Sequence, residues 1–428
     1  MTGAFRTTAK AELEVEMHIP PIEISLYQAV ESSLNRIRGS PLYYKIQQLR
    51  RSAPLKFKWY SPLQKLEHTV ALRLEEGTPP MEVIRPEIIC PWTEPPKIHI
   101  TKGTEAGKLK HNQIAREAKG NPGHVLAYTD GSEINGEVGA SACIPELGAK
   151  AANYMGTNQV STVYAGELRG LQLALDLALK HSLIIRRLTI FTDNQAAIQA
   201  VAKPRNHSGQ YLVQGVRERL RAAQMLSIRV AIHWVPSHVG IDGNEQADVL
   251  AKMATGWREE GGTGPKAPTF PSLQSLSSAA KRTTKARLEA HWANKWENGE
   301  TGRELYRLAP KISKQRLRVH SGLPKAFSAT LTQIRTGKVA LKSYLRRIKR
   351  APDSRCTCGD EQTGRHVLIE CPNFKELRKA VWPYNSQPQS FKAILNQTWS
   401  AKKAAQYMVQ TGLLGQFLEA RNRLEVTN

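Results

Sequence analysis

The sequence predicts an α/β domain in the middle of the chain, in which strands alternate with helices. Residues 124–129 form a short apolar run that ends in Asp-Gly-Ser, the pattern of a strand that runs into a turn. Residues 187–192 repeat this design with β-branched and aromatic residues followed by Asp193. Between them, residues 163–181 carry leucine and alanine at helical spacing. We therefore expect a helix packed on a sheet that contains at least these two strands.

The next two elements follow the same logic. Residues 229–235 are predicted to form another strand, and residues 236–240, with the sequence Pro-Ser-His-Val-Gly, a loop. A helix is expected from Asp242 onward, with Asp242 as its N-cap. His238 lies on the loop, ten positions before Asp248 in the helix. This spacing predicts an imidazole beside a carboxylate.

Four acidic residues occur in these contexts. Asp130 and Asp193 follow strands, Glu167 lies in the first turns of the central helix, and Asp248 lies in the last helix. Taken alone, each is more often a turn, cap or exposed residue than a catalytic one. Carboxylates that a fold brings together repel one another unless a cation holds them, so the joint pattern indicates bound metal. Oxygen ligands favour Mg²⁺ or Mn²⁺.

Four stretches of this region resemble type 1 ribonuclease H, and more narrowly the ribonuclease H region of non-LTR (LINE-type) retrotransposon polyproteins of fungi. They are residues 128–132 (Tyr-Thr-Asp-Gly-Ser), 163–168 (Val-Tyr-Ala-Gly-Glu-Leu), 191–194 (Phe-Thr-Asp-Asn) and the long block 234–252. The resemblance covers roughly residues 120–256. It implies a five-stranded mixed sheet flanked by helices, with strands near residues 124–129, 138–145, 151–157, 187–192 and 229–235.

The resemblance also implies an activity and a set of site residues. The family's four metal-binding carboxylates fall on Asp130, Glu167, Asp193 and Asp248, and its flexible-loop histidine falls on His238. The implied reaction is hydrolysis of the RNA strand of an RNA·DNA hybrid by two Mg²⁺ (or Mn²⁺) ions on the order of 4 Å apart. Asp130 is expected to bridge the ions, with Glu167 and Asp193 on one and Asp248 on the other. His238 is expected to assist proton transfer or product release.

A hybrid-specific enzyme must sense the 2′-hydroxyl of RNA, which short polar side chains and backbone groups can do. The candidate substrate contacts are Gly131, Ser132, Asn194 and Gln195, all adjacent to metal-binding positions; turn and cap chemistry is the alternative interpretation. The basic helical protrusion of cellular family members is missing, because only residues 203–209 separate two helical stretches. Hybrid affinity is then expected to depend on basic surface elsewhere.

Composition points to a nucleic-acid partner. The 428 residues exceed one typical domain, and the formal net charge of +24 with a pI of about 9.9 suits a polyanion. Anionic membrane surfaces are the competing explanation. There is neither a stretch long enough to span a bilayer nor an apolar signal core at the N-terminus. We expect an intracellular protein, nuclear or cytoplasmic, with no membrane association and no evident small-molecule substrate.

The predicted organisation has four parts. Residues 1–115 are a mainly helical connector segment that resembles the region after reverse transcriptase, but the chain has no paired-Asp polymerase motif. The ribonuclease H domain spans 120–256, and residues 257–280 are a Gly, Pro, Ser and Thr linker. Residues 281–428 form a basic helical region. Its interspersed aromatic residues favour phosphate and base contacts over simply solvated helix faces. Residues 404–423 are predicted to be a closing amphipathic helix.

A cysteine and histidine cluster occurs in the last region. Cys356, Cys358, His366 and Cys371 form a C-x-C-x7-H-x4-C arrangement, and four such ligands suit tetrahedral Zn²⁺. Similar clusters occur at the C-terminal ends of non-LTR retrotransposon polyproteins, so the resemblance supports a zinc-knuckle-like segment over residues 356–371. The C-x-C spacing is tighter than the common C-x2-C, and buried thiols with an incidental histidine are the alternative. Cys90 and Cys143 are expected to be ordinary buried thiols.

Two rival functions compete with an active ribonuclease H. The first is a catalytically silent nucleic-acid-binding module of a retrotransposon protein. The second is a transposase or integrase that shares the fold. Intact carboxylates favour an enzyme, and the long block from His238 to Lys252 favours ribonuclease H.

Overall fold

The computed structural model describes residues 3–52, 61–71, 77–86, 96–382, 390–420 and 422. The chain divides into two compact units, Gln28–Ala286 and Met1–Tyr27 together with Arg287–Asn428. Each unit is described by itself. Cys90, and with it part of the Pro-rich connector, lies outside the described residues.

The first unit contains a mixed sheet of six strands in the order β1-β6-β5-β2-β3-β4. The strands are β1 (Lys97–His99), β2 (His124–Ile134), β3 (Glu137–Ile144), β4 (Ala149–Thr157), β5 (Arg187–Thr192) and β6 (Arg229–Trp234). Strands β1, β6, β5 and β2 run parallel, whereas β3 and β4 are antiparallel to their neighbours. The predicted α/β class and mixed sheet are confirmed. The sheet gains a sixth strand, β1, from residues that were expected to belong to the connector.

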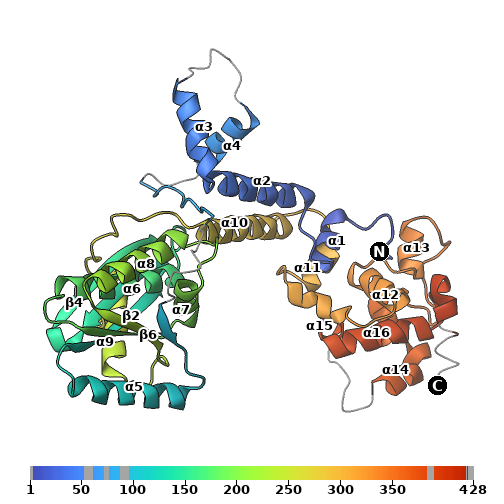
Figure 1. Ribbon diagram of the computed structural model, residues 1–428. Helices are drawn as coiled ribbons and strands as arrows, with labels where there is room; N and C mark the ends of the chain where they lie inside the picture. The colour runs from blue at the N-terminus through green and yellow to red at the C-terminus, as the bar shows by residue number, and fades with distance from the viewer. Residues whose placement is uncertain are drawn as a thin grey trace. The chain divides into compact units, whose positions relative to one another are not determined.

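Helices cover both faces of this sheet (Figure 1). They are α5 (Thr104–Lys119), α6 (Val163–Lys180), α7 (Gln195–Ala202), α8 (Gln210–Met225) and α9 (Asp242–Ala254). Alternate residues of β2 face the two sides: Val125 and Ala127 pack in the core with α6 and α8, and Leu126 and Tyr128 pack in the core with α5 and α9. The sheet is therefore buried on both faces around β2.

Helix α6 lies unusually close to the sheet because glycines line the contact. A Cβ placed on Gly131 would lie 2.4 Å from the backbone nitrogen of Glu167, and one on Gly170 would lie 2.8 Å from the carbonyl oxygen of Ser141. Real side chains do not tolerate such contacts, so backbone rests directly on backbone. This packing brings Glu167 against β2 at Gly131, next to Asp130.

Helix α9 is placed on the opposite face by similar small residues. The hydroxyl of Ser141 donates to the carbonyl of Ala247 at 2.6 Å. A Cβ on Gly243 would lie 2.3 Å from the Tyr128 ring. The N-cap of α9 is Ile241, without a side-chain cap bond, so the prediction that Asp242 caps this helix was wrong. Cys143 is buried here, as expected.

Residues that precede and follow the sheet strands in the sequence form contacts within the same unit. The Glu82 carboxylate accepts from the backbone N–H of Gly209 at 2.7 Å and of Ser277 at 2.8 Å. Phe270 is buried beneath the Arg169 guanidinium, which lies 4.4 Å from the ring centroid. Residues 257–280, expected to be a linker, thus include residues that pack on the sheet unit, and the predicted domain boundaries stay a prediction.

The remaining helices confirm a mainly helical N-terminal segment and C-terminal region. They are α1 (Lys10–Glu16), α2 (Ile22–Arg38), α3 (Pro41–Ser52), α4 (Pro62–Ala71), α10 (Ser277–Glu297), α11 (Arg303–Leu308), α12 (Lys325–Arg335), α13 (Lys342–Arg347), α14 (Lys375–Val381), α15 (Phe391–Asn396) and α16 (Thr398–Gln410). The helix predicted over residues 404–423 was wrong in its bounds, because α16 ends at Gln410 and Gly412 turns the chain with a positive φ of 69°.

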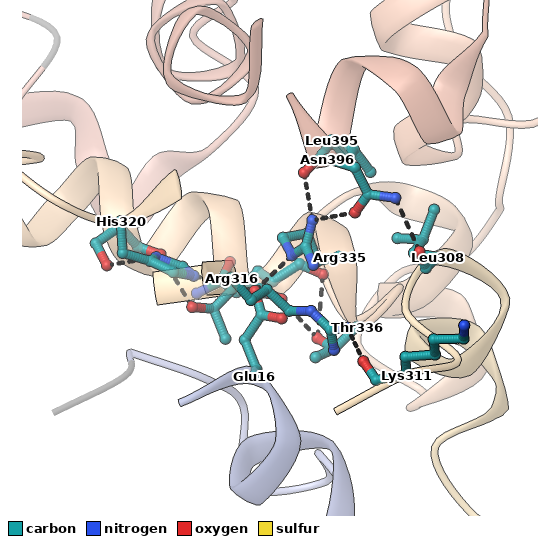
Figure 2. A network of polar contacts seen from close by, with 12 residues as sticks. Glu16, Leu308, Lys311, Arg316, His320, Arg335, Thr336, Leu395 and Asn396 are labelled. Carbon is teal, nitrogen blue, oxygen red and sulfur yellow. Dashed lines mark hydrogen bonds and ion pairs between the residues drawn. The ribbon is translucent and has the colours of Figure 1, made fainter. Parts of the chain in front are cut away.

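Helix α1 is part of the second unit and contributes a buried acid to its core (Figure 2). Glu16 and Arg335 are both fully buried, and the Arg335 Nε lies 2.5 Å from the Glu16 Oε1. The His320 Nε2 lies 3.0 Å from the same oxygen. Burial raises the pKa of Glu16, but hydrogen bonds from His320 and Arg335 and their charges outweigh it and hold the pKa below its ordinary value.

Among the residues that the structure describes, no helix is both long enough and apolar enough to cross a membrane.

Candidate active site

The four predicted carboxylates converge where the end of β5 lies beside the interior of β2. Asp193 follows β5, as expected, but Asp130 lies within β2, which continues to Ile134, so the prediction that this strand ends in a turn at Asp130 was wrong. Ligand atoms of Asp130, Glu167 and Asp193 all lie within 4.8 Å of one another. Asp248 comes from α9 on the opposite face of the sheet, and its charge reaches both Asp130 and Asp193. Asp130 is 7% exposed and Glu167 is 3% exposed. Two strands and two helices that are far apart in the sequence therefore place their acidic side chains close together.

Burial and mutual repulsion perturb these acids. Burial, followed by the charges of Asp193 and Asp248, raises the pKa of Asp130 to about 7. The same causes, burial and then the charge of Asp130, raise the pKa of Glu167. Burial also raises the pKa of Asp193. The raised pKa values mean that neighbouring protein groups do not fully offset the negative charge of these carboxylates. A cation bound among them would offset the rest.

The surrounding groups fit a hard divalent cation. The donors are carboxylate oxygens, the ligands that Mg²⁺ and Mn²⁺ prefer. The Thr192 hydroxyl donates to Glu167 at 3.2 Å and orients its carboxylate. Lys252 donates to Asp248 at 2.6 Å and partly offsets the negative charge.

Residues 122–255 match the family model for RNase H. The match covers less than a third of the chain, and we refer to this region as the RNase H domain. It starts just before β2 and ends just after α9, so it contains all four carboxylates.

The solved structures to which the chain is similar include three RNases H. The N-terminal RNase H domain of a Mycobacterium tuberculosis protein is 22% identical, with 31% of this chain and 93% of that chain covered and a TM-score of 0.26. RNase H1 of Halobacterium salinarum is 23% identical, with 31% and 97% covered and a TM-score of 0.23. LC11-RNase H1, solved in complex with an RNA/DNA hybrid, is 17% identical, with 31% and 96% covered and a TM-score of 0.25. No curated protein matches the chain.

His238 lies where the sequence placed it, on the loop before α9 of the RNase H domain. Its side chain is 71% exposed, and its backbone has a left-handed φ of 52°. His238 Nδ1 lies 4.0 Å from Glu245 Oε2, and these two residues form a second ligand group with Asp248. Glu245 was not predicted. Its signal was available, because it precedes Asp248 by three positions and therefore shares its helix face.

The predicted substrate contacts have structural partners of their own. Gly131 is buried beneath α6, and the Asn194 side chain accepts from the backbone N–H of Ala197 at 3.0 Å as the N-cap of α7. Ser132 is half-buried in β2, and Gln195 is exposed in the first turn of α7. Asn194 therefore has the cap function that was the alternative interpretation, and contact of these four residues with substrate stays a prediction.

The Cys/His cluster, defined as Cys356, Cys358, His366 and Cys371, is brought together in the second unit. Its four ligand atoms lie within 4.8 Å of one another. The Sγ atom of Cys371 lies 3.7 Å from that of Cys356 and 3.8 Å from that of Cys358. A tetrahedron of thiolates about 2.3 Å from a central Zn²⁺ has edges of about 3.8 Å. The separations therefore fit the predicted ligand set.

The surroundings of the Cys/His cluster hold its ligands in place. His366 Nδ1 faces carboxylates of Asp360 at 3.9 Å and Glu370 at 4.0 Å, while its Nε2 lies 3.2 Å from the Cys358 Sγ. A carboxylate near the outer ring nitrogen favours the tautomer that leaves Nε2 free as a ligand. The backbone N–H of Cys356 donates to the carbonyl of Asp360 at 2.7 Å and closes the loop 356–360, which contains the first two cysteines.

Proposed function

We propose that this protein hydrolyses the RNA strand of RNA·DNA hybrids at the RNase H domain. The observation that carries the proposal is the convergence of Asp130, Glu167, Asp193 and Asp248 from the interior of β2, the end of β5 and two helices on opposite faces of one sheet. The match of residues 122–255 to the RNase H family supports it. The formal charge of +24 suits a nucleic-acid partner.

The four carboxylates would hold two divalent cations, Mg²⁺ or Mn²⁺. Bound cations supply Lewis acidity and a nucleophilic water for phosphodiester hydrolysis. The charge of Asp130 interacts with those of Glu167, Asp193 and Asp248, which supports the proposal that Asp130 would serve both cations. Glu167 and Asp193 belong to one ligand group and Asp248 to the other.

The chain's own groups would move protons and position the substrate. His238 is exposed beside Glu245 and Asp248, and imidazole is suited to proton transfer at neutral pH. The partly exposed Ser132 and Gln195 flank the carboxylates and are available to the sugar-phosphate backbone, including the 2′-hydroxyl. Asn194 and Gly131 would contact the substrate only through atoms that the α7 cap and the packing against α6 leave free.

The second unit carries a companion proposal, that the Cys/His cluster holds one structural Zn²⁺. The sulfur separations of 3.7 and 3.8 Å support it. The block 234–252 and the Cys/His cluster together resemble non-LTR retrotransposon polyproteins, so we propose that the protein derives from such an element.

The direct test is cleavage of a hybrid whose RNA strand carries a label. We expect the wild-type protein with Mg²⁺ to produce internal cuts in the RNA strand and to leave single-stranded RNA and double-stranded RNA intact. Asp130→Asn should lower the rate by a factor on the order of a thousand or more, because it removes a charge at the reacting centre. Glu133→Gln, an exposed change on the same strand, should retain the wild-type rate.

The same assay distinguishes the binding-module alternative. If the wild type and Asp130→Asn bind the hybrid equally and are equally inert over a range of Mg²⁺ and Mn²⁺ concentrations, the hydrolysis proposal fails and the silent module is favoured.

A further inference from the structure

A cavity of about 450 Å³ lies in the second unit, beside the Cys/His cluster. Its walls come from α11, the end of α12 and the turn after it, α13, Phe391 at the start of α15, and residues 362–365, which lead directly into the cluster ligand His366. The volume lies within the roughly 300 to 1,000 Å³ typical of small-ligand sites.

The cavity has an apolar interior. Leu308, Ile334, Val339 and Leu341 line it, and all four side chains are buried. Gly364 adds bare backbone to the wall, where a Cβ would lie 3.7 Å from both Ile334 and Val339. Apolar side chains and a glycine wall leave room for a flat group to lie against them.

Arginines line the same cavity near its solvent side. Arg307 and Arg365 side chains are 71% and 67% exposed, and Arg347 is exposed as well. The Arg347 guanidinium lies over the ring of Tyr344, 5.3 Å from its centroid. Glu304 is the one carboxylate among the residues that line the cavity, and it pairs with Arg307 at 2.8 Å. Arg365 pairs with Glu370, outside the lining, at 2.9 Å. Arg347 donates to the carbonyl of Gly337 at 3.3 Å, and the described residues give it no carboxylate partner. The rim therefore carries three arginines and one carboxylate.

One wall of the cavity is the segment that leads into the Cys/His cluster. Gln362 accepts from the backbone N–H of Lys342 at 2.9 Å through its side chain, and its own N–H donates to the carbonyl of Ser354 at 2.9 Å. The first bond joins the segment just before His366 to the start of α13, which carries Arg347, and the second joins it to residues before Cys356.

We infer that this cavity is a nucleotide-binding pocket, in which a nucleobase lies on the apolar interior and its phosphate contacts the arginines of the rim. A planar apolar group with an attached anion matches both parts of the lining, because the planar group fits the apolar interior and the anion fits the arginines of the rim. Guanidinium groups bind phosphate and stack on aromatic rings. The nucleotide is either free or part of a single strand. The inference goes beyond hybrid hydrolysis, because the pocket is in the other unit and requires no cleavage.

The test measures binding of a fluorescein-labelled DNA octamer to the full chain by fluorescence anisotropy at fixed salt. Single-stranded DNA is not the substrate of the proposed ribonuclease, so failure of hybrid cleavage would leave this measurement unaffected. Arg347→Ala is compared with Arg350→Ala, which removes the same charge from an exposed position that does not line the cavity. We expect Arg347→Ala to weaken binding by roughly fivefold to a hundredfold, because without the phosphate contact the base is no longer held in the pocket and the contribution of one bound base is lost. Arg350→Ala should weaken it by a clearly smaller factor.

A second probe isolates the base. With an abasic octamer of equal length and charge, the two variants should bind alike, because the interior of the pocket then has no partner. Arg365→Gln provides an independent variant with the same expectation if Arg347→Ala fails to fold, as judged by its zinc content and unfolding midpoint. A mononucleotide that displaces the octamer at comparable concentration identifies the free nucleotide as the source; displacement only by oligomers identifies the strand.

Two outcomes would overturn the inference. One is an equal effect of the pocket variant and Arg350→Ala on the normal octamer, which would show a general electrostatic contribution. The other is displacement of the octamer by polyglutamate of matched charge as effective as displacement by DNA, which would show that the site takes an acidic peptide.

Discussion

Replacing Asp130 with asparagine is expected to stabilise the RNase H domain when divalent cations are absent, although the same change should abolish the proposed activity. Asparagine has nearly the same shape and carries no charge. In the folded protein, Asp130 is 7% exposed and lies among three other acids, so its ionised form is disfavoured there.

The magnitude and the sign follow from the pKa of Asp130, which rises from 3.8 to about 7 on folding. A raised folded-state pKa means that stability is fully present below the unfolded value and is lost as the pH rises through the folded value. For a single group, this loss is about 0.5 kcal/mol at pH 4 and on the order of 4 kcal/mol at pH 8. Asp130→Asn removes it, so the variant's advantage should grow between these two pH values.

The free energy of unfolding of the RNase H domain can be measured by hydrogen exchange of β2 and β5 amides as a function of urea concentration. This measurement reports on that domain without interference from the second unit. Asp242→Asn, an exposed change at the start of α9, serves as the control and should show no pH-dependent gain. Added Mg²⁺ should stabilise the wild type and narrow its difference from Asp130→Asn. A variant no more stable than the wild type at pH 8, or an advantage equal at pH 4 and pH 8, would refute the reasoning.

Three further changes probe the packing and the second unit. Glu16→Gln leaves the fully buried Arg335 without its acid and should cost roughly 3 to 5 kcal/mol in urea unfolding. Glu23→Gln, at a pair whose side chains are both more than two-fifths exposed, should cost little; equal losses would contradict the buried network. Cys358→Ser should contain about one equivalent less zinc than the wild type by metal analysis, while Cys143→Ser should keep it, and the ligand set is wrong if both contain the same amount. Gly131→Ala should destabilise the RNase H domain by about 1 to 3 kcal/mol, since its Cβ meets the backbone of α6; unchanged exchange of α6 amides would argue against that close contact.

The elements that position the candidate site could be predicted because their signals are local. Alternating and β-branched residues predicted β2, β5 and β6, and the leucine spacing predicted α6. The order of acids along these elements then predicted the convergence of Asp130, Glu167 and Asp193. The exact closeness of α6 to the sheet was missed, because glycine pairs such as Gly131 and Gly170 carry no hydrophobic pattern.

Other features depend on contacts that no local pattern contains. Strand β1 has only three residues and follows a Pro-rich stretch, so it lacks a periodic signal and exists only through its pairing with β6. Glu16 reads in the sequence as an ordinary surface residue of a short helix. Its burial requires Arg335 and His320 from the far end of the chain, and pairing over such separations is set by tertiary structure.

The burial of α1 among C-terminal helices has a consequence for the order in which the chain matures on the ribosome. Arg335 follows Glu16 by 319 residues, so at roughly 5 to 20 residues per second its partner is synthesised about 16 to 64 s later. The whole RNase H domain emerges during that interval and has time to fold. A helix of seven residues is too short to persist alone in water, so α1 acquires its final structure only after most of the polypeptide has been translated.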